Sequence, residues 1–193
     1  MTDFLLKHWI EIFAVVTGLL YVYLEIEQKK AMWIVGIISS AIFVYVYFGA
    51  KFYASMIESG YYVIISVYGY FKWNGELKPE IGKSKIKNQK SKILTFISVG
   101  LILSAILGWT LKNFTDSPVP YFDGLKVAFG VVATWMVTQK IIQHWYFWMG
   151  INIFCVPLYA SQGLYFTAFM FFVYFIMSII GLQKWKKDLI KEP

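Results

Sequence analysis

The sequence has 193 residues, of which 59% are hydrophobic and only 15% are charged, with a mean hydropathy of +0.59. A soluble domain of this length would be about one-quarter charged, so the composition excludes an ordinary soluble fold. The net charge of +7 could by itself indicate nucleic-acid binding, but the apolar residues occur in runs of about 20, the length that spans a bilayer. These values predict a polytopic, all-α membrane protein.

Seven apolar runs predict seven transmembrane helices, because lipid offers the backbone no hydrogen-bonding partners. In chain order the predicted spans are 9–26, 32–49, 52–72, 93–112, 123–140, 145–160 and 163–183. A tight turn at 49–51 separates the second span from the third, and a polar segment at 72–92 precedes the fourth. The first span is not expected to be a cleaved signal peptide, because no small-residue cleavage site follows it.

The basic residues, all of them lysine, fall mainly on one side of the predicted membrane. The four on the other side are Lys7, Lys51, Lys112 and Lys126, and the remaining 14 of the 18 share one side. Basic residues favour the cytoplasmic side, so we expect the N-terminus outside and the C-terminus in the cytoplasm of a bacterial inner membrane. The lysines are interpreted as orientation signals and lipid-headgroup contacts rather than as a nucleic-acid site.

An offset of 112 residues aligns the chain with itself without gaps. It places Gly18 on Gly130, Trp33 on Trp145, Tyr47 on Tyr159, Tyr62 on Tyr174, Ser66 on Ser178, Gly69 on Gly181 and Trp73 on Trp185. The offset moves each helix four spans along the chain, so equivalent helices point in the same direction. This predicts a 3+1+3 layout of two parallel three-helix repeats, as in SWEET proteins. The predicted parts of this single membrane domain are repeat one at 9–73, a linker and connector helix at 74–122, repeat two at 123–185 and a basic tail at 186–193.

The sixth predicted span carries aromatic and polar residues on one helical face. Trp145, Trp148, Asn152 and Tyr159 recur at helical spacing, and Asn152 lies near the middle of the span. Transporters built from repeats bind their ligand near this depth, so the face predicts a wall against a flat polar molecule. The alternative is an interfacial aromatic belt with an amide that packs helices.

Other candidates come mainly from repeat one. Glu58 could stabilise a cationic ligand, although an acid near a helix start is also explained by snorkelling to the interface. The further residues expected to line the path are Trp33, Ser40, Tyr47, Ser59 and Tyr62. For the serines, close helix packing is the alternative. Glu25 beside Lys29 predicts a solvated ion-pair cluster at the end of the first span.

The sequence lacks the motifs of several other function classes. No metal-ligand spacing, phosphate-binding glycine loop or nucleophile motif is present, so neither a cofactor nor an enzyme is expected. The single cysteine, Cys155, is interpreted as a core residue. Pro157 has Tyr45 as its counterpart, so a hinge there would serve only the second repeat.

With the repeat, the face of the sixth span, and the segments QGLYFTA at 162–168 and Tyr61-Tyr62 in view, the chain resembles the PnuC family of vitamin transporters. The resemblance implies a SWEET-like facilitator for nicotinamide riboside, with a thiamine-transporting branch as the alternative. It implies ligand contacts at Trp145, Trp148 and Asn152. The implied partners are a small vitamin, the bilayer and a cytoplasmic kinase that traps the vitamin, with a homo-oligomer left open.

The chain departs from the nicotinamide riboside members at two places. It has Ser39 and Ser40 where they tend to carry Asn, and Ser59 where they tend to carry Gln. Both vitamins are flat cationic rings, so tryptophan and a nearby acid would suit either. The sequence contains no chain of acidic residues suited to proton relay, so transport is not expected to be coupled to an ion. A membrane scaffold that transports nothing is the more distant alternative.

Overall fold

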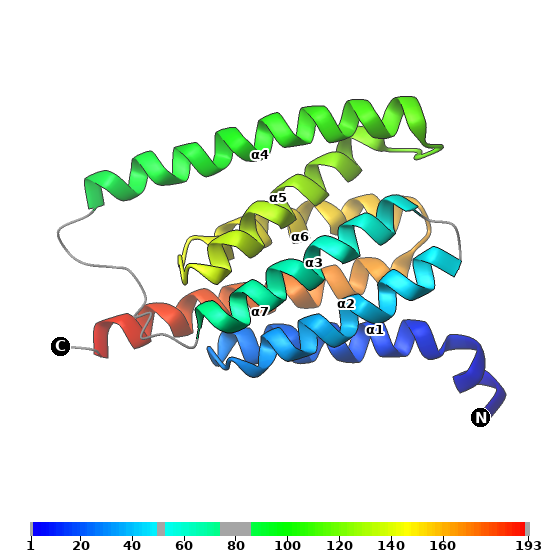
Figure 1. The fold of residues 1–193 in the computed structure, drawn as a ribbon, viewed down its shortest axis with the longest axis horizontal. Helices are drawn as coiled ribbons and strands as arrows, with labels where there is room; N and C mark the ends of the chain where they lie inside the picture. The colour runs from blue at the N-terminus through cyan, green and yellow to red at the C-terminus, as the bar shows by residue number, and fades with distance from the viewer. Residues whose placement is uncertain (1, 50–52, 74–85, 192–193) are drawn as a thin grey trace. The chain divides into compact units, whose positions relative to one another are not determined.

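The computed structural model describes residues 2–49, 53–73 and 86–191. Within these ranges the chain forms seven helices in the predicted order (Figure 1). They are α1 (Thr2–Ile26), α2 (Ala31–Gly49), α3 (Tyr53–Lys72), α4 (Ile86–Phe114), α5 (Pro120–Thr138), α6 (His144–Ser161) and α7 (Tyr165–Lys191). The tight turn at 49–51 and the lysine-rich segment that follows α3 fall largely outside the described residues.

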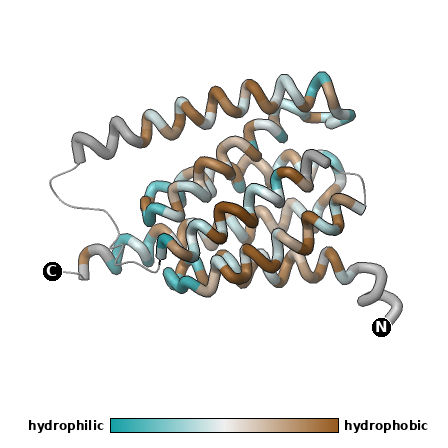
Figure 2. Tube along the Cα trace, viewed as in Figure 1, coloured by the Kyte–Doolittle hydropathy of each residue, from teal (hydrophilic) through white to brown (hydrophobic). Residues whose placement is uncertain are grey.

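The prediction of seven helices is confirmed, and three of them are long and apolar enough to cross a membrane. These three segments are Ala31–Gly49, Ile93–Phe114 and Tyr165–Asp188, and Ile12–Ile26 forms a shorter apolar stretch. Figure 2 shows mostly hydrophobic residues along the described helices, with hydrophilic residues gathered near their ends. Lysine and glutamine are good helix formers, which explains why α4 and α7 extend past their apolar parts.

The chain divides into two compact units, Met1–Glu76 with α1 to α3 and Leu77–Pro193 with α4 to α7. In the first unit α2 packs against both α1 and α3. The side chain of Trp33, in the first turn of α2, is fully buried against Gly69 of α3. A methyl group on Gly69 would lie 2.6 Å from the indole, so glycine is what admits the ring. Trp73 then meets Trp33 edge-on, with 5.5 Å between ring centroids and 89° between planes.

The second unit contains the same arrangement, 112 residues later. Here α6 packs against α5 and α7, and Trp145 at the start of α6 is fully buried. A methyl group on Gly181 of α7 would overlap the indole of Trp145. Trp185 meets Trp145 edge-on, with 5.9 Å between ring centroids and 87° between ring planes. We refer to these two clusters, Trp33–Gly69–Trp73 and Trp145–Gly181–Trp185, as the tryptophan clamps.

The turn between α1 and α2 is a Schellman motif built on a non-glycine residue. The N–H of Gln28 donates to the carbonyl of Glu25 at 3.0 Å, and the N–H of Lys29 donates to that of Leu24 at 2.8 Å. This pair of bonds satisfies the last carbonyls of a helix and requires a left-handed residue between them. Gln28 supplies it with a φ of 52°.

The turn between α5 and α6 repeats that motif bond for bond. The N–H of Lys140 donates to the carbonyl of Val137 at 2.9 Å, and the N–H of Ile141 donates to that of Met136 at 3.0 Å. Lys140 has a φ of 50° and stands at the 112-residue offset from Gln28. The two helix pairs therefore leave their turns with the same local geometry.

Replacing Lys140 by glycine is expected to raise the thermal midpoint of the purified protein. A left-handed residue with a Cβ costs about 1–2 kcal/mol, and glycine removes that cost. The greater freedom of glycine in the unfolded chain takes back about 0.5–1 kcal/mol, so the net gain is small and positive. Lys140→Ala is the control, because it removes the lysine but keeps the Cβ. An equal rise in both variants would assign the effect to the lysine side chain instead of to φ.

The fourth helix has no counterpart in the first unit. It packs against α5, and the two backbones approach most closely where Gly124 faces Gly108. A Cβ on Gly124 would lie 2.5 Å from the backbone nitrogen of Gly108. Figure 1 shows α4 and α5 converging toward this end and diverging toward the other. A cavity lies between α4, α5 and α6.

Candidate functional site

The amide of Asn152 lies in the middle of α6 and is 5% exposed. Its Nδ2 donates to the Oγ of Ser178 on α7 over 3.5 Å. The Ser178 hydroxyl in turn donates to the carbonyl of Tyr174 at 2.8 Å. A donor–acceptor distance of 3.5 Å is at the outer limit for a hydrogen bond, so the helix pair holds the amide only weakly.

Trp148 lies one turn before Asn152 on α6 and is half-buried. It packs against a hydrophobic cluster of the second unit that includes Val132, Ala133 and Met136 of α5. Its indole Nε1 is buried and makes no hydrogen bond within the described part of the chain. A buried donor without a partner is costly, so this N–H is suited to a polar group of a ligand.

Trp145 and Trp33 occupy a different environment from Trp148. Both are fully buried in the tryptophan clamps, where glycine backbone and a second tryptophan enclose their rings. His144 adds a further contact to Trp145, with 4.5 Å between ring centroids. The prediction placed Trp145 and Trp33 against the ligand, whereas the structure gives them a packing role inside their own units.

Tyr159 and Tyr47 occupy equivalent places near the ends of α6 and α2. Tyr159 stacks on Phe171 of α7, with 5.1 Å between centroids and 3° between planes. Tyr47 stacks on Phe43 of its own helix at 5.8 Å and 24°. Both tyrosines are half-buried. Pro157 lies inside α6, and the helix continues past it to Ser161.

The other predicted residues of the first unit lie on α2 and α3. Ser59 is 8% exposed, whereas Glu58, Tyr62 and Ser40 are half-buried. Tyr61 and Tyr62 meet edge-on, with 5.5 Å between ring centroids. The predicted site residues thus fall into two sets, one in each unit.

Glu25 corrects one expectation. It was predicted to join a solvated ion-pair cluster, but its side chain is only 2% exposed while Lys29 is exposed. The repeat contains the signal that this prediction missed. The residue 112 positions later is Val137, which is 1% exposed, so position 25 is a buried position of the fold.

Two contacts between helices were not anticipated. The hydroxyls of Thr17 on α1 and Ser39 on α2 lie 3.2 Å apart and join the two helices. Ser66 lies so close to Gly36 that a methyl group there would approach its Oγ to 2.7 Å. Small residues on facing helices were the available signal, since they permit close approach in membranes.

The sequence profile described as nicotinamide mononucleotide transporter matches residues 8–187. The chain belongs to this family. The match covers both tryptophan clamps, both Schellman turns and Asn152. Members of the nicotinamide mononucleotide transporter family are transporters and not enzymes, in agreement with the absence of catalytic motifs from the sequence.

Individual members of the family show similarity along most of the chain. The nicotinamide riboside transporter PnuC of Escherichia coli is 21% identical over 92% of this chain and 84% of its own length. The nicotinamide riboside transporter PnuC of Haemophilus influenzae is 24% identical over 93% of this chain and 80% of its own length. The riboflavin/roseoflavin transporter RibM of Streptomyces davaonensis is 20% identical over 92% of this chain and 84% of its own length.

A crystal structure of the vitamin B3 transporter PnuC has the same fold. Its TM-score is 0.72 at 22% identity, and the match covers 99% of this chain and 86% of that one. The fold of the family is therefore present here from α1 to α7.

Proposed function

We propose that this protein is a facilitator that takes up nicotinamide riboside across the cytoplasmic membrane for NAD synthesis. The observation that carries the proposal is the family match across residues 8–187, in which relatives named as nicotinamide riboside transporters align along most of the chain. Riboflavin is the second candidate, because RibM aligns over a similar share of the chain. Thiamine stays in the comparison because it is a flat cationic ring like nicotinamide riboside.

The proposed architecture is two parallel three-helix repeats joined by α4. The tryptophan clamps and the Schellman turns support it, since both recur at an offset of 112 residues. Transporters of this type open alternately to each side as one repeat rocks against the other around a central site. The lysine distribution supports an outer N-terminus and a cytoplasmic C-terminus in the inner membrane.

The proposed ligand contacts are found within each repeat. Trp148 would stack on the cationic ring and offer its indole N–H, and Asn152 would hydrogen-bond a polar substituent. Trp145 and Trp33 would position the helices that carry these contacts. Glu58 would complement the charge of the ligand. Ser40, Ser59, Tyr62, Tyr47 and Tyr159 would line the path.

Flux into proteoliposomes tests the function directly. The purified protein is expected to move nicotinamide riboside, and to move riboflavin and thiamine more slowly, each supplied alone at equal concentration. Nicotinamide riboside carries a positive charge, so an imposed potential shifts its final distribution by about 2.3 kcal/mol per 100 mV. A pH gradient at zero potential is expected to leave that distribution unchanged, because no proton is coupled.

The variant Glu58→Gln separates the candidate ligands. It is expected to weaken the binding of nicotinamide riboside and of thiamine by a similar factor. The binding of riboflavin, a neutral ring, is expected to stay unchanged. Protein-free liposomes measure leakage. Absence of flux for all three vitamins would support a membrane scaffold and overturn the proposal. Flux of riboflavin faster than that of nicotinamide riboside would make riboflavin the substrate.

A further inference from the structure

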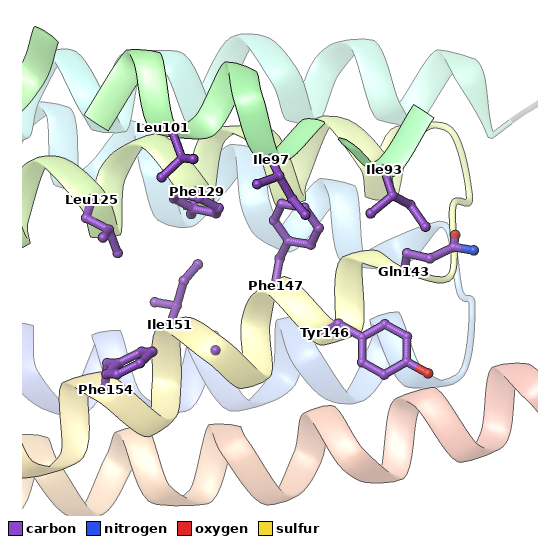
Figure 3. Close-up of a pocket in the computed structure, with 11 residues that line it drawn as sticks. Ile93, Ile97, Leu101, Leu125, Phe129, Gln143, Tyr146, Phe147, Ile151 and Phe154 are labelled. Carbon is purple, nitrogen blue, oxygen red and sulfur yellow. The ribbon is translucent and has the colours of Figure 1, made fainter. Parts of the chain in front are cut away.

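The second unit contains a cavity of about 470 Å³ between α4, α5 and α6 (Figure 3). Its apolar wall includes Ile97 and Leu101 from α4, Phe129 from α5, and Phe147 and Phe154 from α6. Leu101 is 55% exposed and Phe154 is 62% exposed, so the cavity is open along one side. An open apolar cavity on a helical membrane protein is suited to a hydrocarbon chain.

The length of the cavity fits one leaflet of a bilayer. Its wall extends from Gln143, the residue that caps the start of α6, to Phe154 on α6. At about 1.5 Å per residue this stretch is about 16 Å long. The hydrocarbon core of a bilayer is about 30 Å thick, so one leaflet contributes about 15 Å. A single acyl chain therefore matches the cavity from end to end.

A glycine keeps the cavity open in its middle. Gly150 of α6 lines the cavity, and a methyl group built on it would meet nothing within 4 Å. This glycine differs from Gly181, whose missing side chain is replaced by the ring of Trp145. The space beside Gly150 is not used by the packing of the helices.

The polar groups of the cavity gather at one end. Gln143 and Tyr146 lie at the end where Ile93 forms the wall (Figure 3). The Nζ of Lys186 donates to the hydroxyl of Tyr146 at 3.2 Å and lies 5.7 Å from the centre of its ring. An ammonium, a phenol and an amide at the mouth of an apolar cavity complement a lipid phosphate.

We propose that this cavity binds an anionic phospholipid from the leaflet on the lysine-rich side. One acyl chain lies along Gly150 between α4 and α6, and the phosphate meets Lys186, Tyr146 and Gln143. The inference depends on the membrane setting of the proposed function but not on which vitamin is carried. The lipid fills the wedge between these diverging helices and so stabilises the packing of α4 against α5 and α6.

Native mass spectrometry of the purified protein tests this assignment. The probes are phosphatidylglycerol and phosphatidylethanolamine with the same acyl chains, mixed in equal amounts. We expect one phosphatidylglycerol per chain to be retained in preference to phosphatidylethanolamine. Gly150→Leu fills the cavity and is expected to reduce retention of both lipids at least tenfold. Lys186→Gln is expected to abolish the preference while phosphatidylethanolamine remains bound.

Matched controls exist for both variants. Gly60 of α3 is also a helical glycine with open space around it, so Gly60→Leu makes the same chemical change away from the cavity. Lys187→Gln removes an exposed lysine next to Lys186. Equal lipid retention by Gly150→Leu and the unmodified protein would overturn the proposal. An oligomer that dissociates only in Gly150→Leu would also overturn it, by assigning the cavity to a second copy of the chain.

Discussion

Replacing Gly181 by alanine will lower the thermal midpoint of the protein, although alanine is the better helix former. The new methyl group would overlap the indole of Trp145, which Trp185 and His144 hold in place. Overpacking of this kind costs about 1–3 kcal/mol. Because the same clamp exists in the first unit, Gly69→Ala is expected to have a similar effect. The measurement is thermal unfolding in detergent, followed by size-exclusion chromatography.

Gly150→Ala is the matched control for this prediction, because it makes the same change in the same unit without a steric clash. It is expected to leave the thermal midpoint unchanged or to raise it. Trp145→Phe in the Gly181→Ala background provides room for the methyl group and is expected to recover part of the loss, which a double-mutant cycle measures. The clamp would be disproved if Gly181→Ala and Gly150→Ala had equal midpoints.

Replacing Asn152 by alanine is expected to weaken the binding of nicotinamide riboside about 10- to 100-fold, while the protein still inserts and folds. Among the described residues the amide donates to Ser178 over 3.5 Å, a weak bond, so its loss removes little from the helix pair. A polar group of the ligand left without its partner costs about 1–3 kcal/mol, and about 1.4 kcal/mol is a factor of ten in affinity. Titration calorimetry on the purified protein measures the change.

Ser178→Ala distinguishes a ligand contact from a packing role. If Asn152 serves only to bond Ser178, both variants should change affinity and stability to the same small extent. If Asn152 binds the vitamin, its replacement should lower affinity far more than that of Ser178. Uptake by Asn152→Ala at the unmodified rate would remove this residue from the proposed site.

The helices and their order could be predicted because they depend on local information. Runs of apolar residues set where each helix lies, and lysine-rich segments between and after them lengthen α4 and α7 at their ends. The tryptophan clamps could also have been predicted from the sequence, because Trp33, Gly69 and Trp73 all recur at the 112-residue offset. A matched glycine and tryptophan on neighbouring helices indicate a ring seated on a bare backbone.

The candidate site was harder to predict, because a sequence does not say what encloses an aromatic ring. Trp145 and Trp148 share one predicted face, yet the first is enclosed by α7 and the second packs against α5. The buried position of Glu25 was hidden by the lysines beside it. The cavity at Gly150 could not be anticipated, because it depends on the angle between α4 and its neighbours, which Gly108 and Gly124 fix through tertiary packing.

The self-contained clamp of the first unit has a consequence for how the protein is made. Trp33, Gly69 and Trp73 all belong to the first unit. The matching tryptophan emerges 112 residues later, which at about 5–20 residues per second is a delay of about 6–20 s. Helix pairing is far faster than this, so the first three helices can close on one another while the ribosome is still making their counterparts.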